Sequence, residues 1–219
     1  MSSAFFGWPQ AALDFYAGLE ADNTKTYWTA HRAVYDEDVL APMQALLAEL
    51  EPEFGAGKVF RPYRDVRFSA DKSPYKIEIG ASLGDSGYIR LAAGGLAIGA
   101  GCHMMSPQQL ASYRTAVADD ATGDELEAAI EDLAAHDIGI SVQERLKTLP
   151  RGFGPDAAHP DLLRNKDIAA WKSWPVEPWL HTPEAAERVA EALRNTRPLT
   201  DWLAAHVGAH EAEGGRGRR

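Results

Sequence analysis

The sequence predicts an α+β fold, in which an antiparallel sheet of about four or more strands (residues 58–104) is packed by N-terminal and C-terminal helices. Two observations predict it. Apolar residues recur at helical spacing up to about residue 50 and again after residue 103, whereas between these segments they alternate with a period of two. Helices, then strands, then helices along the chain are typical of the α+β class.

Three helices are expected before the strands. The first has an apolar face at spacing i, i+3, i+4, i+7, formed by Ala12, Phe15, Tyr16 and Leu19. Asn23 can cap a second helix, on which three ring-bearing side chains share a face: Trp28, His31 and Tyr35. The third has an apolar stripe of Val39, Met43, Leu46, Leu47 and Leu50. Pro42 must lie in the first turn of that helix or kink it.

The strands follow from residue 58. The run KVFRPYRDVRF (58–68) is rich in aromatic and β-branched residues, and Pro62 indicates an edge position or a bulge. In KIEIGASL (76–83) the apolar residues alternate with polar or small ones. Tight turns at residues 85–87 and 94–95 lead into YIRLA and LAIGAGCHM, and connections of hairpin length predict antiparallel pairing.

The C-terminal half reads as helical. Capping boxes at residues 106–109 and 122–125 begin two helices. Residues 150–181 are rich in loops and contain a short helix in LLRNKDIAAW, and a last helix begins at Thr182-Pro183 and is interrupted at Pro198. We expect one domain over residues 1–207 and a disordered basic tail over residues 208–219.

Composition excludes several classes of protein. The 219 residues carry a formal charge of −10, with 45% hydrophobic and 25% charged residues, as in ordinary soluble proteins. No apolar run reaches the roughly 18 residues of a membrane span, and the N-terminus lacks the order of a signal peptide. We therefore expect a cytoplasmic protein that contacts no membrane. The single cysteine, Cys102, lies on the apolar side of its strand and is expected in the core.

No recognised spacing indicates a metal or a cofactor. HxxxH, HExxH and CxxC are all absent, so we expect no metal site, although residues distant in sequence could assemble one in space. Gly99-Ala100-Gly101 lacks the third glycine of a dinucleotide-binding loop, and the cofactor is left unknown.

Positive charge is concentrated in one segment. Residues 58–76 contain six basic and two acidic residues in an otherwise acidic chain, a distribution that favours an anion there. On a regular strand, Arg61 and Arg67 would share a face of the sheet with Lys76, Glu78, Tyr88 and Arg90. Small residues on the fourth strand complete the expected pocket, with Gly99 and Gly101 as its floor and Arg67, Lys76, Arg90 and His103 as its rim. The loop at residues 69–75 would cover one end.

The run FRPYRDVRFSADKSPYKIEIGA (60–81) resembles the signature of the bacterial and fungal proteins grouped as the domain of unknown function 2461. The resemblance continues in FFGWPQAALDFYAGLEADNTKTYW (5–28), GGLAIGAGCHMMSPQQLASYR (94–114) and HPDLLRNKD (159–167). It implies an intracellular single-domain protein without an established activity, so no site residues are carried over. The sequence departs from the family at Thr24-Lys25 and at Cys102-His103-Met104, and the second departure argues against a family-wide role for His103.

We interpret the basic face as a site for a small anionic ligand, such as one bearing phosphate, in a binding module or an enzyme. The expected ligand-binding residues are Arg61, Arg67, Lys72, Tyr75, Lys76, Tyr88, Arg90 and His103. If a reaction follows, the candidates for a catalytic base are Asp65, Glu78 and His31.

The patterns leave four other interpretations open. The arginines could form surface ion pairs with Asp65 and Glu78, and His31 could be packed in the interior. The same arginines and the tail could instead bind nucleic acid, or the Trp-rich C-terminal region could bind a protein.

Overall fold

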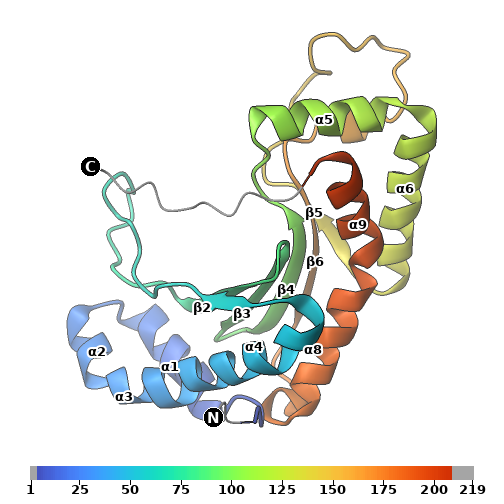
Figure 1. Ribbon diagram of the computed structural model, residues 1–219. Coiled ribbons are helices and arrows are strands. Elements are labelled where there is room, and N and C mark those ends of the chain that lie inside the picture. Colours follow the sequence, from blue (N-terminus) through green and yellow to red (C-terminus); the bar gives the residue numbers. More distant parts are fainter. Residues whose placement is uncertain (1–3, 209–219) are drawn as a thin grey trace. The chain divides into compact units, whose positions relative to one another are not determined.

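The computed structural model describes residues 4–208 and confirms the α+β class (Figure 1). Its strands form one antiparallel sheet in the order β1-β2-β3-β4-β6-β5. The chain divides into two compact units: unit 1 comprises Met1–Ile98 and Ser173–Glu191, and unit 2 comprises Gly99–Lys172 and Ala192–Arg219. The single domain expected over residues 1–207 stays a prediction, and residues 209–219 of the expected tail lie outside the described residues.

The N-terminal helices of unit 1 are α1 (Gln10–Ala21), α2 (Lys25–Ala30), α3 (Arg32–Val34), a π-helical turn η1 (Tyr35–Leu40) and α4 (Ala41–Phe54). The apolar stripes expected on the first and third helices are buried, and Pro42 lies in the first turn of α4. The expected cap of α2 is wrong by one residue. The Thr24 hydroxyl accepts the N–H of Tyr27 at 3.2 Å, and the Asn23 side chain bonds to Tyr75 instead.

The sheet of unit 1 is built on β1 (Gly57–Val59), β2 (Glu78–Leu83), β3 (Gly87–Ala92) and the first part of β4 (Gly95–Cys102). β2 and β3 pair antiparallel, with Ala81 opposite Ile89 and Gly80 opposite Arg90. Helix α4 packs against β1 and β2. The apolar side of β2 and β3 is buried, as its alternation predicted, and consists of Ile79, Ala81, Leu83, Ile89 and Leu91.

The strand expected over residues 58–68 is wrong beyond Val59. Residues 60–77 leave the sheet as an irregular excursion that has one isolated bridge, between Tyr63 and Tyr75. Its two arms still lie side by side, because the N–H of Arg64 donates to the carbonyl of Pro74 at 2.9 Å and the N–H of Lys76 to that of Pro62 at 2.8 Å. Neither proline has an N–H, so a continuous ladder cannot form. The alternation that placed Arg61 and Arg67 on one sheet face therefore does not apply.

Unit 2 contains α5 (Pro107–Ala118), α6 (Asp120–Ala135), β5 (Gly139–Ser141), α7 (Pro160–Leu163) and α9 (Arg197–His206). The capping box at Ser106 is confirmed, with the hydroxyl accepting the N–H of Gln109 at 3.2 Å. The box expected at Thr122 is wrong, because the Asp119 carboxylate accepts the Thr122 N–H at 3.1 Å and α6 begins at Asp120. Strand β6 (Ile168–Trp174) and helix α8 (Glu184–Asn195) each have residues in both units, and η2 (Pro178–His181) belongs to unit 1.

Strand β6 replaces the helix expected in LLRNKDIAAW. Helix α7 ends at Leu163, and the buried run from Ile168 to Ala170 pairs antiparallel with β5. An unbroken apolar run is typical of a strand covered on both faces, and its period does not distinguish it from a buried helix. Asp167, 3% exposed, fixes the start of this strand by accepting the backbone N–H groups of Gln143 at 2.6 Å and Glu144 at 2.7 Å.

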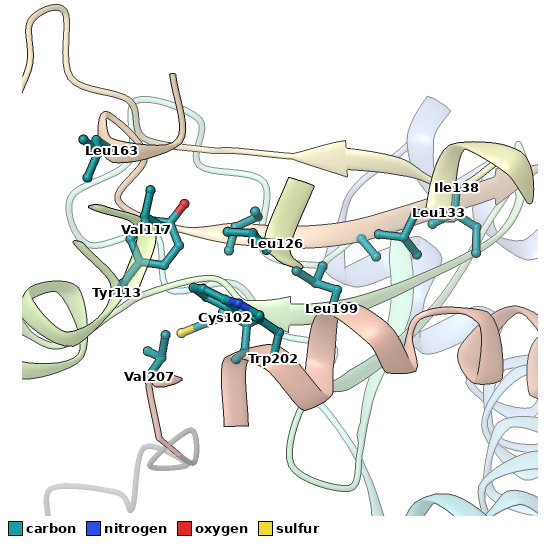
Figure 2. Packing of buried hydrophobic residues seen from close by; sticks show 13 residues of the cluster. Cys102, Tyr113, Val117, Leu126, Leu133, Ile138, Leu163, Leu199, Trp202 and Val207 are labelled. Atoms are coloured by element: carbon teal, nitrogen blue, oxygen red, sulfur yellow. The ribbon is translucent and has the colours of Figure 1, made fainter. Parts of the chain in front are cut away.

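The core of unit 2 collects apolar side chains from its helices and strands (Figure 2). The Trp202 indole packs edge-on to Tyr113, with ring centroids 6.0 Å apart, and donates to the carbonyl of Thr122 at 2.9 Å. Cys102 is buried in this cluster, which confirms the expectation of a core residue, and burial raises the pKa of its thiol. Among residues 4–208, no helix has the length and apolar character needed to cross a membrane.

Candidate functional site

A pocket of about 690 Å³ lies in unit 1, where the excursion at residues 60–77 meets the helical layer. This volume lies within the roughly 300–1,000 Å³ range of small-molecule sites. The lining residues come from the end of α1, the segment before α2, the excursion and the start of β2: Glu20, Asn23, Arg64, Asp71, Ser73, Tyr75, Lys76, Ile77 and Glu78.

The Asn23 side chain fixes one wall of this pocket. Its amide group donates to the carbonyl of Tyr75 at 3.0 Å, and its carbonyl accepts the N–H of Tyr75 at 3.1 Å. The Tyr75 ring is buried and stacks on Trp28 of α2, with centroids 4.4 Å apart and planes 6° from parallel. Stacking and a two-way hydrogen bond together hold the excursion against the helices, and so they position Lys76, the next residue.

The arginine of the pocket is engaged within the excursion. Arg64 pairs with Asp71, and that carboxylate also accepts the N–H of Ser73 at 2.9 Å and its hydroxyl at 2.6 Å. These bonds from Ser73, with the bond and charge of Arg64, hold the pKa of Asp71 well below its usual range. The pair is thus ionised at neutral pH.

Lys76 differs from Arg64 in its surroundings. Its side chain is half-buried, and the ammonium nitrogen lies 5.5 Å from the centre of the Phe60 ring. Of the two basic residues that line the pocket, only Lys76 has no carboxylate within 4.0 Å in the described part of the chain. An anion in the pocket would supply the missing partner.

Glu78 is held on the polar face of the sheet at the edge of the pocket. Arg90 donates to Glu78 Oε2 at 3.1 Å, and the Tyr88 hydroxyl lies 3.5 Å from Oε1. Gly80 makes room for this arrangement, since a Cβ there would come within 2.7 Å of the Tyr88 hydroxyl. Burial, reinforced by the charge of Glu78, raises the pKa of Tyr88 to about 12, so the phenol remains a neutral donor. Glu78, Tyr88 and Arg90 share a face as expected, and of these Glu78 lines the pocket.

The other predicted residues of the excursion lie outside the pocket lining. Arg67, 74% exposed, pairs with Asp65 at 2.6 Å, and its hydrogen bonds lower the pKa of Asp65 to about 2, which makes Asp65 a weak base. Lys72 donates to the carbonyl of Val66 at 2.9 Å, and Arg61 is exposed. Arg67 and Asp65 thus match the surface ion pair left open above.

His31 also lies outside the lining residues. Its Nδ1 donates to the carbonyl of Tyr27 at 2.9 Å, and its ring stacks on Tyr27 with centroids 4.0 Å apart. The rings of Trp28 and Tyr35 instead contact each other, with centroids 4.7 Å apart. The face predicted to include His31 is therefore wrong, because α2 ends at Ala30 and His31 forms its C-cap.

In unit 2, residues of β6, the strand next to β4 in the sheet, fill the space beside Gly99 and Gly101. The ring of Trp171 occupies the space at Gly99, where an added Cβ would lie 3.0 Å from it. Gly101 lies against the backbone of Ile168, whose carbonyl oxygen would be 2.5 Å from a Cβ. The bare floor expected at these glycines is therefore filled. His103 is exposed just beyond the strand.

Of the predicted site residues, the pocket brings together Tyr75, Lys76 and Glu78. Sequence reasoning missed six lining residues: Glu20, Asn23, Arg64, Asp71, Ser73 and Ile77. Asp71 and Ser73 lie in the loop that was expected to cover the site, so the sequence did indicate that they lie near the pocket. Asn23 had no such signal, because nothing in the sequence connects it with a residue 52 positions away.

Comparison with known proteins gives one match. A family model described as "Conserved hypothetical protein (DUF2461)" matches residues 11–202. No curated protein and no solved structure matches the chain.

Proposed function

The chain belongs to the DUF2461 family, whose description names no activity, and we propose that unit 1 binds a small ligand by its anionic group at Lys76. The observation that carries this proposal is that Lys76, a half-buried residue lining a pocket, has no carboxylate within 4.0 Å of its ammonium among residues 4–208. A phosphate or carboxylate oxygen in the pocket would give this cation a charge-assisted hydrogen bond.

Arg64 is suited to complete the anion site, whereas the N–H and the hydroxyl of Ser73 already donate to Asp71. A guanidinium has five N–H donors in a planar fork, and the ion pair with Asp71 involves Nη1. The remaining donors are available to a second acceptor in the pocket. The Asn23–Tyr75 hydrogen bonds keep this wall in place without ligand, which reduces the entropy lost on binding.

The acidic residues of the lining restrict the class of ligand. Glu20 and Glu78 line the same pocket as Lys76, and a like charge close to an anion costs free energy. A polyphosphate would meet this repulsion more than once. We therefore propose a ligand with a single anionic group and with hydroxyl or amino donors for the carboxylates, such as a phosphorylated sugar or amino alcohol. Of the three candidate bases, Glu78 is the one that such a ligand would contact.

A thermal-shift panel of phosphate monoesters, carboxylates and nucleoside triphosphates tests this proposal. Ligand at about 100 times its Kd adds roughly 2.7 kcal/mol of stability, which raises the Tm by several degrees. We expect a compound with a single phosphate or carboxylate group to raise the Tm of the wild type and of Lys58→Met, an exposed lysine on β1, but not that of Lys76→Met. A flat panel, or a shift that Lys76→Met retains, contradicts the proposal.

A second candidate function, binding of single-stranded nucleic acid, is supported by Phe68. This ring is 97% exposed on the excursion and the Arg67 guanidinium lies 5.9 Å from its centre, with Arg61 and Lys72 exposed on the same segment. Bases stack on such rings for about 1–3 kcal/mol each. Fluorescence anisotropy with a labelled oligonucleotide should show salt-dependent binding that Phe68→Ala weakens by about tenfold or more. Absence of binding at low salt argues against this function.

A further inference from the structure

His159 of unit 2 lies between two carboxylates of helix α6. Its Nδ1 is 2.9 Å from Glu127 Oε1, and its Nε2 is 3.5 Å from Asp124 Oδ1. The imidazole side chain is 8% exposed, whereas Asp124 and Glu127 are 76% and 54% exposed. The ring lies directly over Gly123, where any side chain would collide with it. The histidine is therefore confined to a site whose outer side is open to solvent.

The protons of this cluster do not match its acceptors. A neutral imidazole carries one N–H and one lone pair, so with both nitrogens facing carboxylates one nitrogen–oxygen contact joins two acceptors. A cation between the two atoms would give each of these acceptors a partner.

The longer of the two contacts, between His159 Nε2 and Asp124 Oδ1, has the distance expected between two ligands of one metal ion. A distance of 3.5 Å between Nε2 and Asp124 exceeds that of a good hydrogen bond. Two ligands at about 2.1 Å from a tetrahedral metal ion are about 3.4 Å apart. One ligand atom from each of the three residues lies within 4.8 Å of the others, so Glu127 lies beside the pair formed by His159 and Asp124.

The surroundings favour a cation as well. Residues 119–137 contain eight acidic residues and neither lysine nor arginine, so the local potential is negative. The Glu127 carboxylate contacts Nδ1, the ring nitrogen that does not face Asp124. Carboxylates commonly orient metal-binding histidines through a hydrogen bond at this second nitrogen.

We propose that His159 Nε2 and the Asp124 carboxylate bind a divalent transition-metal ion of the Zn²⁺ type, with Glu127 orienting the ring and water completing the coordination. An imidazole ligand favours this class over Ca²⁺ or Mg²⁺. The site lies wholly in unit 2 and does not depend on the function proposed for unit 1. Its residues match no recognised spacing, so no motif in the sequence indicates a metal.

Zn²⁺ titration by calorimetry of chelator-treated protein tests the site. We expect the wild type to bind one Zn²⁺ per chain. His159→Gln and Asp124→Asn should bind it about tenfold or more weakly, or not at all. Asp132→Asn is the matched control, because this exposed carboxylate lies on α6 about 12 Å along the axis from Asp124. It should bind as the wild type does. Failure of the wild type to bind Zn²⁺, or unchanged binding by His159→Gln, overturns the proposal.

A measurement on the wild type avoids dependence on the folding of the variants. Substoichiometric Mn²⁺ broadens amide resonances near its binding site, and we expect the broadening to centre on residues 123–128 and 158–160. Ca²⁺ in excess should not reverse it. Broadening centred elsewhere in the chain, or reversed by Ca²⁺ as at an ordinary acidic surface, overturns the proposal.

Discussion

At the residue scale, Asn23 links parts of unit 1 that are distant in sequence. Its replacement by alanine removes both hydrogen bonds to Tyr75 and leaves a part-buried N–H and carbonyl without these partners. Because each unsatisfied group costs about 1–3 kcal/mol, we expect Asn23→Ala to lower the free energy of unfolding by at least that amount. Urea denaturation measures it.

Two further variants interpret the result for Asn23. Thr24→Ala removes only the cap of α2, which is worth about 1 kcal/mol. Asn23→Asp keeps the acceptor for the Tyr75 N–H and loses the donor to its carbonyl, so its stability should lie between those of the wild type and Asn23→Ala. If Asn23→Ala is as stable as the wild type, this side chain does not hold the wall of the pocket.

The raised pKa of Tyr88 predicts a loss of stability at alkaline pH. Burial raises this pKa from 10.0 to about 12. Between these values the unfolded chain releases the phenolic proton while the folded protein retains it, so stability is complete below pH 10 and is lost as pH rises toward 12. Tyr88→Phe should show a smaller alkaline loss in urea unfolding. It will not abolish the loss, because burial also raises the pKa of Tyr35 to about 12. An unchanged pH profile in Tyr88→Phe would contradict this assignment.

At the element scale, the approach of β4 to β6 within unit 2 depends on glycine. Gly101 has a φ of +145° and lies against the carbonyl of Ile168, so Gly101→Ala meets both strain and a collision with backbone. We expect a loss of about 1–3 kcal/mol or more, since packed strands cannot move apart without disturbing their neighbours. Gly94→Ala, which has nothing within 4 Å of the added Cβ, is the control. Equal stability of the two variants, measured by thermal unfolding, would show that β4 and β6 are not tightly packed at Gly101.

The elements also show which parts of the fold can be predicted from the sequence. Helices α1 and α4 and the β2–β3 pair have one buried face, and one-sided burial gives a clear period. Strand β6 is buried throughout from Ile168 to Ala170, so no alternation of apolar and polar residues identifies it as a strand. The excursion at residues 60–77 has strand-like composition, but Pro62 and Pro74 interrupt its pairing, and local propensity does not outweigh a missing donor.

The same limit applies to the pocket. Glu78 could be predicted because it begins the regular strand β2, where alternation determines the face, and Lys76 lies only two residues before it. Arg67 was misplaced because the chain is irregular there and Asp65, two residues earlier, already neutralises it. Asn23 depends on the tertiary approach of the helices to Tyr75, and a single sequence contains no record of that approach.

At the scale of the whole molecule, the two units share strands. The boundary between them falls inside β4 and β6, so each of these two strands has residues in both units. We predict one cooperative unfolding transition for the described chain. Leu46→Ala in α4 and Leu126→Ala in α6 each remove a fully buried side chain, and each should cost about 2–5 kcal/mol.

The readout is urea unfolding followed separately by tryptophan fluorescence and far-UV circular dichroism. If residues 1–207 form one domain, as predicted, each variant should shift both transitions together. Two transitions, of which each variant shifts only one, would show that the units fold independently.

Anion binding at Lys76 in the pocket of unit 1 can be followed in a chemical-shift map of ¹⁵N-labelled protein titrated with inorganic phosphate. We expect saturable shifts at Asn23, Ser73, Tyr75 and Lys76 that disappear in Lys76→Met and persist in Lys58→Met. Shifts that centre on Phe68, or that grow without saturation over the whole basic segment, would contradict it.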